Sequence, residues 1–117
     1  MREIAAARIT TAFSDRVDPL MRGHFIEQVA LNDKDAYVRA ARAAFGFSAC
    51  DRVGEIGAPT LVVVGEADRT FPLPWMEDLA TRISGARLSR LPGAGHLSNL
   101  ERPQEFNRVV LEFLEQR

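Results

Sequence analysis

The chain has 117 residues, of which 46% are hydrophobic and 26% are charged, a composition typical of one small folded domain or of part of a larger one. Its 15 basic and 16 acidic side chains are mixed along the sequence and give a net charge of -1, which argues against a nucleic-acid or anionic-membrane surface. The single cysteine, Cys50, excludes an internal disulfide and a cysteine-clustered zinc site. The longest aliphatic run, Leu61–Val64, is too short to span a bilayer, and no signal-peptide pattern is present, so we expect a cytoplasmic protein.

Residues 1–55 carry only helical patterns. A first stripe of apolar residues is followed by Asp18-Pro19, a typical helix start, and then by a second stripe at helical spacing. Asn32 or Asp33 can cap a third helix, whose alanine-rich stripe predicts a modest contribution to the core. The first stripe consists of Ile4, Ala5, Ile9, Ala12 and Phe13, and the third of Tyr37, Ala40, Ala41, Ala44 and Phe45.

Residues 56–117 alternate strand, helix, strand, helix. The β-branched run Thr60–Val64 has no polar alternation, which predicts a parallel strand covered on both faces. A helix with Gly85 as its C-cap follows, and then Arg87–Leu91 alternates polar and apolar residues like an edge strand. Pro103 opens the last helix. This order implies a right-handed crossover and two adjacent parallel strands, so the fold class is α/β.

Both predicted strands are followed by a side chain that can take part in catalysis. Asp68 lies just beyond the first strand and His96 just beyond the second. Ligand sites of open parallel sheets lie beyond the carboxyl ends of the strands, so the two side chains reach the same edge. A carboxylate that accepts the Nδ1 proton of a histidine makes that histidine a general base for a nucleophile. The other interpretation is that Asp68 caps the next helix and that His96 is an ordinary loop residue.

Other candidate residues have a simpler structural interpretation. Ser98 is near His96, but a backbone hydrogen bond or a helix cap is the expected role. Cys50 is predicted to be a small buried hydrophobic residue rather than a nucleophile, because nothing places it at a helix N-terminus. His24 is expected on a helix, and no spacing predicts a metal site around it.

Two further patterns near the pair also favour structural roles. Gly93-Ala94-Gly95 follows a strand, but Ser98 stands where a dinucleotide fingerprint needs its third glycine. Phe71 and Trp75 flank the loop of Asp68, where packing is favoured over a substrate platform.

Two segments resemble the α/β-hydrolases. Residues 59–72, read as PTLVVVGEADRTFP, look like the acid strand of that fold, and residues 91–103, read as LPGAGHLSNLERP, look like its histidine loop. The resemblance is closest to 3-oxoadipate enol-lactonases and neighbouring esterases. It implies that residues 1–55 are a cap-like helical segment and that residues 56–117 are the C-terminal βαβα part of the hydrolase core. It further implies Asp68 and His96 as acid and base of a Ser-His-Asp triad, with no metal and no organic cofactor.

The nucleophile of that family is not found in this sequence. The order in the family is nucleophile, acid, histidine, with the serine in a G-x-S-x-G elbow. Among the eight glycines only Gly93 and Gly95 are two residues apart, and Ala94 lies between them. The resemblance therefore implies a C-terminal hydrolase portion that needs a nucleophile-bearing half to cleave a small ester or enol-lactone. The alternative is a non-catalytic remnant that folds as a self-associating module.

The strand at Thr60–Val64 indicates a partner for the chain. It is apolar on both faces, and with only one neighbouring strand its other edge stays unpaired. An unpaired apolar strand edge recruits another chain. We therefore expect either a homodimer through this edge or docking on a separately encoded N-terminal hydrolase half.

Overall fold

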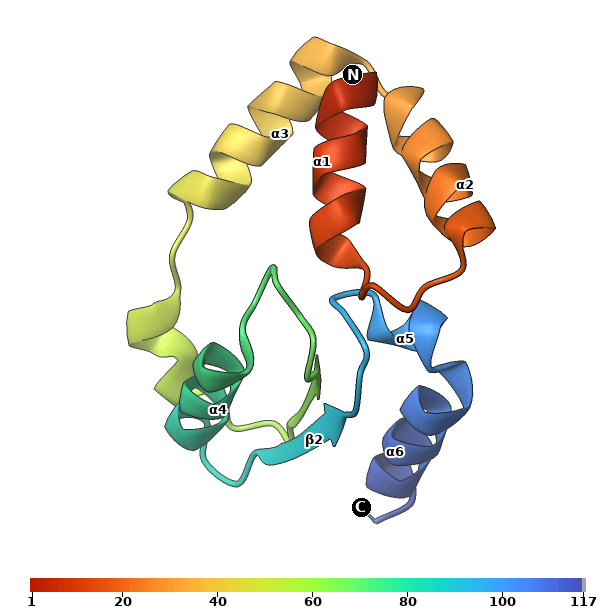
Figure 1. Cartoon of the computed structure of the whole chain (residues 1–117). Coiled ribbons are helices and arrows are strands. Elements are labelled where there is room, and N and C mark those ends of the chain that lie inside the picture. Colours follow the sequence, from red (N-terminus) through yellow and green to blue (C-terminus); the bar gives the residue numbers. More distant parts are fainter. Residues whose placement is uncertain (117) are drawn as a thin grey trace.

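A computed structural model describes residues 1–116, which form six α-helices, one 3₁₀-helix and two strands (Figure 1). In chain order these are α1 (Arg2–Ala12), α2 (Pro19–Ala30), α3 (Lys34–Gly46), η1 (Cys50–Glu55), β1 (Leu61–Gly65), α4 (Leu73–Arg82), β2 (Arg87–Leu91), α5 (Ser98–Glu101) and α6 (Pro103–Glu115). Helices α1 to α3 lie at one end of the molecule and the two strands lie at the other.

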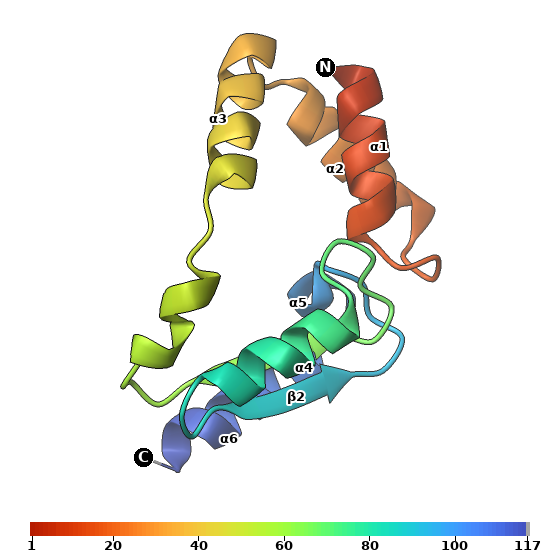
Figure 2. The same cartoon turned by 90° about the vertical axis from the view of Figure 1, so that its left-hand side faces the viewer.

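The strands β1 and β2 pair in parallel, with Leu61 opposite Arg87 and Gly65 opposite Leu91. Helix α4 connects them and packs on one face, while α6 lies on the opposite face (Figure 2). Val62 and Val64 are buried between these layers. Two parallel strands with flanking helices confirm the expected α/β class and the C-terminal portion that the resemblance implied.

The helix between the strands ends earlier than expected. Its last residue is Arg82, whereas the sequence pattern predicted Gly85 as the C-cap. Gly85 instead has a φ of 70° and lies in the turn that leads into β2. Glycine suits this turn because positive φ is costly for residues with a Cβ atom.

Helix α1 buries the apolar stripe that the sequence predicts. Ala5 and Phe13 are fully buried and Ile9 is 6% exposed. Helix α2 packs against α1, and the Phe25 ring meets the Phe13 ring edge-on, with 5.4 Å between the ring centroids. This pair of helices forms the core of the helical end.

The starts of α2 and α3 are fixed by aspartate caps. The Asp18 side chain accepts a hydrogen bond from the Leu20 N–H at 2.8 Å, and Pro19 is the first helical residue. Asp33, rather than Asn32, caps α3 by accepting from the Ala36 N–H at 2.7 Å. Both starts agree with the sequence prediction, because a carboxylate at this position satisfies an otherwise unpaired helix N–H.

Helix α3 stands apart from the other elements (Figures 1 and 2). Phe45, on its predicted apolar stripe, is 80% exposed, and Phe47 just after the helix is 76% exposed. The expected contribution of this stripe to the core is therefore not seen. Among the described residues no element covers that face, although the sequence makes it apolar.

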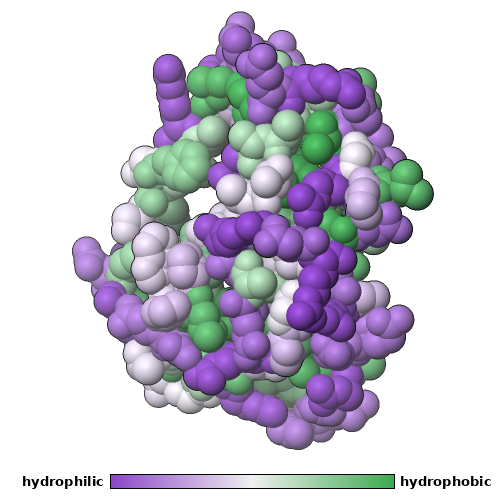
Figure 3. All heavy atoms as spheres, in the orientation of Figure 1, coloured by the Kyte–Doolittle hydropathy of each residue, from purple (hydrophilic) through white to green (hydrophobic). Residues whose placement is uncertain are grey.

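The molecule has more surface than a compact chain of its size. Its accessible area is 7981 Å², whereas a compact monomer of 13.0 kDa exposes about 6,300 Å². Its radius of gyration is 15.9 Å, against about 13 Å expected for a compact chain of this length. Figure 3 shows apolar side chains at several separate places on one face. Within residues 1–116 no helix is long and apolar enough to cross a membrane.

Candidate functional site

Asp68 lies in the loop that follows β1, and its carboxylate is held by the backbone of that loop. Oδ1 accepts hydrogen bonds from the Thr70 N–H at 2.7 Å and from the Phe71 N–H at 2.9 Å. The Asp68 N–H donates to the Gly65 carbonyl at 3.0 Å. The side chain is only 6% exposed. These bonds occupy Oδ1 and orient Oδ2 away from the loop.

His96 lies in the loop that follows β2 and meets this second oxygen. Its Nδ1 is 3.0 Å from Asp68 Oδ2, and its side chain is 36% exposed. The Phe71 ring packs beside the imidazole, with 5.3 Å between the ring centroids. The structure thus brings together the two residues that the sequence singled out, at the carboxyl edge of the sheet.

The contact fixes which imidazole nitrogen carries the proton. An ionised carboxylate can only accept hydrogen bonds, so His96 donates from Nδ1. A neutral histidine that donates from Nδ1 carries its lone pair on Nε2. That nitrogen can take a proton from a nucleophile, and the carboxylate then stabilises the imidazolium that forms.

The two loops are joined to each other at the ends of the strands. The Ala67 N–H donates to the Ala94 carbonyl at 2.8 Å, and the Glu66 N–H donates to the Leu91 carbonyl at 3.1 Å. A Cβ atom at Gly65 would lie only 2.3 Å from the carbonyl oxygens of Ala94 and Gly95. Glycine is therefore required at position 65 for the loops to approach this closely.

The histidine loop is also fastened to the end of α1, through Glu101. Glu101 Oε1 accepts from the Ser14 N–H at 3.0 Å and from the Gly95 N–H at 2.9 Å, and Oε2 accepts from the Ser14 hydroxyl. The Leu97 N–H donates to the Ala12 carbonyl at 3.2 Å. The sequence pattern indicated no role for Glu101, because its partner Ser14 is 87 residues away in sequence.

The acid loop is fastened to the same segment by Arg69. Its guanidinium donates to the Thr10 carbonyl at 3.1 Å and the Phe13 carbonyl at 2.9 Å, and it pairs with the Asp15 carboxylate at 3.1 Å. The sequence pattern did not reveal Arg69 either. Its position beside Asp68 was the only available signal.

The other candidates from the sequence lie away from the pair or serve the fold. Cys50 is exposed at the start of η1, so the predicted burial was wrong: η1 contacts α4, but this contact does not cover the Cys50 side chain. Ser98 is buried and begins α5, where its carbonyl accepts from the Arg102 N–H. His24 packs edge-on against Phe25 on α2. Trp75 is 62% exposed rather than packed.

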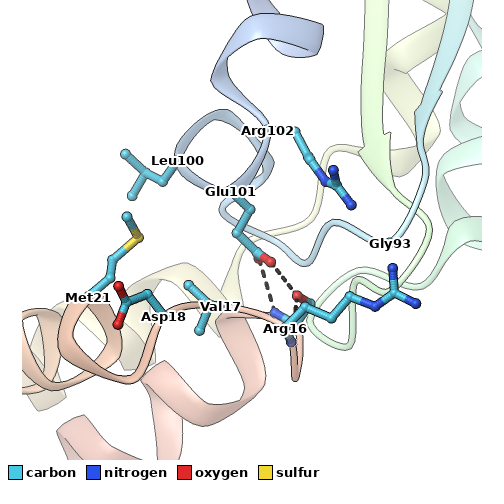
Figure 4. Close-up of a pocket in the computed structure, with 9 residues that line it drawn as sticks. Arg16, Val17, Asp18, Met21, Gly93, Leu100, Glu101 and Arg102 are labelled. Atoms are coloured by element: carbon cyan, nitrogen blue, oxygen red, sulfur yellow. Dashed lines mark hydrogen bonds between the residues drawn. The ribbon is translucent and has the colours of Figure 1, made fainter.

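A pocket lies beside the Glu101–Ser14 contact, and both residues line it (Figure 4). It is formed by the α1–α2 connection, Gly93, α5 and Arg102, and neither Asp68 nor His96 lines it. Figure 4 shows the Glu101 carboxylate reaching across to the α1–α2 connection. The pair therefore lies outside this pocket, with Asp68 buried and His96 partly exposed.

Comparisons with known proteins show which family this chain resembles. Residues 2–109 match the sequence profile of the Alpha/beta hydrolase family. A 2-hydroxy-6-oxo-6-phenylhexa-2,4-dienoate hydrolase of Comamonas testosteroni is 40% identical over 85 residues, which cover 72% of this chain and 30% of that protein. A 2-hydroxy-6-oxononadienedioate/2-hydroxy-6-oxononatrienedioate hydrolase of Pseudomonas putida is 32% identical over 108 residues, which cover 88% of this chain and 34% of that protein. The chain therefore spans about a third of the length of these relatives.

A solved structure shows the same fold. The enol-lactonase from Burkholderia xenovorans LB400 superposes with a TM-score of 0.90 at 27% identity, over 98% of this chain and 45% of that one. The matched family profile, the parallel strands and the carboxylate–histidine pair at their ends lead to one assignment: the chain belongs to the alpha/beta hydrolase family.

Proposed function

We propose that this chain supplies the acid and the histidine of a Ser-His-Asp triad that hydrolyses small carboxylic esters or lactones. The observation that carries the proposal is the 3.0 Å contact between Asp68 Oδ2 and His96 Nδ1 at the carboxyl edge of the sheet. In this proposal residues 1–55 act as a cap over the pair, and residues 56–117 carry the pair itself. The serine comes from a complementary portion of the hydrolase, on the same polypeptide or on another, and we expect the protein to act in the cytoplasm.

The proposed reaction is acyl transfer through this serine. The serine oxygen bonds to the substrate carbonyl carbon while His96 Nε2 takes the serine proton. The C–O bond then breaks, and the leaving oxygen takes that proton from His96. Water loses a proton to the same nitrogen and attacks the acyl-serine, which releases the carboxylic acid and returns the proton to serine. Asp68 holds the imidazole in place throughout.

The substrate class rests on the relatives and on the mechanism. One structural neighbour is an enol-lactonase, and another, from Thermogutta terrifontis, is an esterase at 28% identity. Both names describe cleavage of a carboxylic C–O bond, which the proposed acyl transfer performs. The two relatives named above are hydrolases of a dienoate and of a dienedioate or trienedioate, so a dienoate belongs in the substrate panel as the competing possibility.

The complementary portion is proposed from the surface of the chain. Within the described residues β1 pairs only with β2, and the accessible area exceeds that of a compact chain by more than a thousand Å², on the order of a protein–protein interface. A hydrolase portion that carries the nucleophile buries this surface and also supplies the serine of the triad. A second copy of the chain buries it without completing a triad, which is the non-catalytic alternative.

A fusion protein tests the function. The N-terminal portion of the Burkholderia enol-lactonase is joined to this chain to provide the G-x-S-x-G elbow expected of the family. Hydrolysis is measured on an activated ester, an enol-lactone and a dienoate. We expect ester and lactone turnover, and we expect His96→Ala to lower kcat by about 10⁴-fold or more. Asp68→Ala should lower kcat by a smaller factor, because the histidine base remains.

His24→Ala is the matched control, since it removes the other histidine of the chain. It should leave turnover unchanged, because His24 lies on α2 against Phe25. A folded fusion that shows no turnover, or one whose turnover survives His96→Ala, contradicts the proposal. Turnover of the dienoate alone would replace the ester and lactone assignment.

A further inference from the structure

The backbone around His96 is held from outside its own loop. The residue before it, Gly95, donates its N–H to Glu101 at 2.9 Å, and the residue after it, Leu97, donates its N–H to the Ala12 carbonyl at 3.2 Å. Because both neighbouring peptide groups are anchored, the position of the imidazole depends on these anchors. One anchor is a carboxylate and the other is the last turn of α1.

Glu101 is the centre of this arrangement. It accepts three hydrogen bonds, two from Ser14 and one from Gly95, and both of those residues are buried. Figure 4 shows its side chain bridging to the segment after α1. Hydrogen bonds to a carboxylate are stronger than those between neutral groups, so this contact is a rigid one.

The packing at Gly95 leaves no space for a side chain. A Cβ atom there would lie 2.5 Å from the Ser14 nitrogen, 2.7 Å from Glu101 Oε1 and 2.8 Å from the Phe13 carbonyl carbon. The histidine loop therefore touches the end of α1 backbone to backbone. A displacement of Phe13 and Ser14 would therefore also displace Gly95, the residue next to His96.

We infer that Glu101 is a positioning residue that sets the Asp68–His96 contact by tying the histidine loop to Ser14. The inference rests on the proposed function, since positioning has a purpose only if the pair is catalytic. In this inference the end of α1 helps to position the catalytic pair, in addition to the cap role proposed for residues 1–55. Arg69 adds a second tie, from the acid loop to the same segment, so both loops share one support.

Nuclear magnetic resonance of the 117-residue chain tests the inference without any substrate. The chain has two histidines, so the His96 ring signals can be assigned against those of His24. In the unaltered chain we expect a hydrogen-bonded Nδ1 proton on His96, and slow exchange of the Gly95 and Ser14 amide protons. Asp68→Asn should abolish the His96 Nδ1 proton signal. Its loss assigns that signal to the hydrogen bond between His96 and Asp68.

Glu101→Ala should cause loss of the His96 Nδ1 signal, measured well below the melting temperature of the variant. The Gly95 amide should exchange about tenfold faster or more, the factor that corresponds to about 1.4 kcal/mol. Glu101→Gln keeps an acceptor oxygen for the two N–H groups and should restore both signals in part. Glu112→Ala, which removes an exposed carboxylate on α6 paired with Arg108, should change neither.

The outcomes separate the inference from the proposed function. If Glu101→Ala is folded and keeps the His96 signal, the inference is wrong and the Asp68–His96 pair stands. If Glu101→Ala does not fold, the unaltered chain still tests the inference. Rapid exchange of its Gly95 amide proton, alongside an intact His96 Nδ1 signal, would contradict the role of the Gly95–Glu101 hydrogen bond. If the unaltered chain lacks the Nδ1 signal altogether, the pair is not formed and the proposed function fails.

Discussion

Helices α1 and α3 have 11 and 13 residues and both carry an apolar stripe, but they have different surroundings. The α1 stripe is buried against α2, and the end of α1 is tied to the loops of Asp68 and His96. The α3 stripe ends in Phe45, which is 80% exposed. An apolar stripe is typical of a helix that packs against another element. Helix α1 packs in this way against α2, whereas no element among the described residues covers the stripe of α3.

Truncation of one phenylalanine in each region should give the largest contrast. Phe13→Ala removes a fully buried ring and should lower the free energy of unfolding by about 3–5 kcal/mol. Phe45→Ala removes an exposed ring and should change it by less than about 0.5 kcal/mol. Urea unfolding followed by circular dichroism measures both. Equal losses would show that α3 is packed in solution.

A methyl group at Gly95 should have the next largest effect. Its Cβ would meet backbone atoms of Phe13 and Ser14 below 3.0 Å, so Gly95→Ala should cost about 1–3 kcal/mol and disturb the His96 ring signals. Gly46→Ala, at the end of α3 with nothing within 4 Å, is the matched control and should not destabilise the chain. If Gly95→Ala leaves both stability and the His96 signals unchanged, α1 does not contact the histidine loop as described.

Loss of an N-cap should distinguish a packed helix from an unpacked one. Asp18→Ala removes the cap of α2 and should lower global stability by about 1 kcal/mol, because α2 packs on α1. Asp33→Ala removes the cap of α3 and should mainly reduce local helicity, seen as faster amide exchange over residues 34–46. A global loss from Asp33→Ala equal to that from Asp18→Ala would contradict the separate status of α3.

The smallest expected effect is a gain in stability at Gly23. This glycine lies inside α2, and a methyl group added there would meet nothing within 4 Å, so Gly23→Ala should raise the free energy of unfolding by about 0.5–1 kcal/mol. Thermal unfolding measures the change. A loss of stability would show that another surface covers this side of α2.

Local chemistry made much of the fold predictable. Asp18 and Asp33 supply caps that act within three residues, and the Val-rich run of β1 indicates a buried strand without reference to anything distant. The meeting of Asp68 and His96 was predictable because parallel neighbouring strands end at one edge. These features depend on short-range geometry or on a general rule of topology.

The contacts of Glu101 and Arg69 could not be predicted in the same way. Each joins loops at the sheet edge to the end of α1, and the partners are 87 residues apart for Glu101 and 54 to 59 apart for Arg69. No spacing of residues in the sequence indicates either set of contacts. The exposure of Cys50 and Phe45 was missed for the opposite reason, since a sequence shows that a residue is apolar but not whether its cover is in the same chain.

Light scattering followed by amide hydrogen exchange, on this chain mixed with the N-terminal portion of the Burkholderia enol-lactonase, tests whether the chain docks on a nucleophile-bearing hydrolase portion. We expect a one-to-one complex in which the β1 amides and the residues around Phe45 become protected from hydrogen exchange. A chain that stays monomeric in the mixture, with β1 and Phe45 as exposed as before, would contradict it. A stable homodimer that does not bind the added portion would instead support the self-associating, non-catalytic alternative.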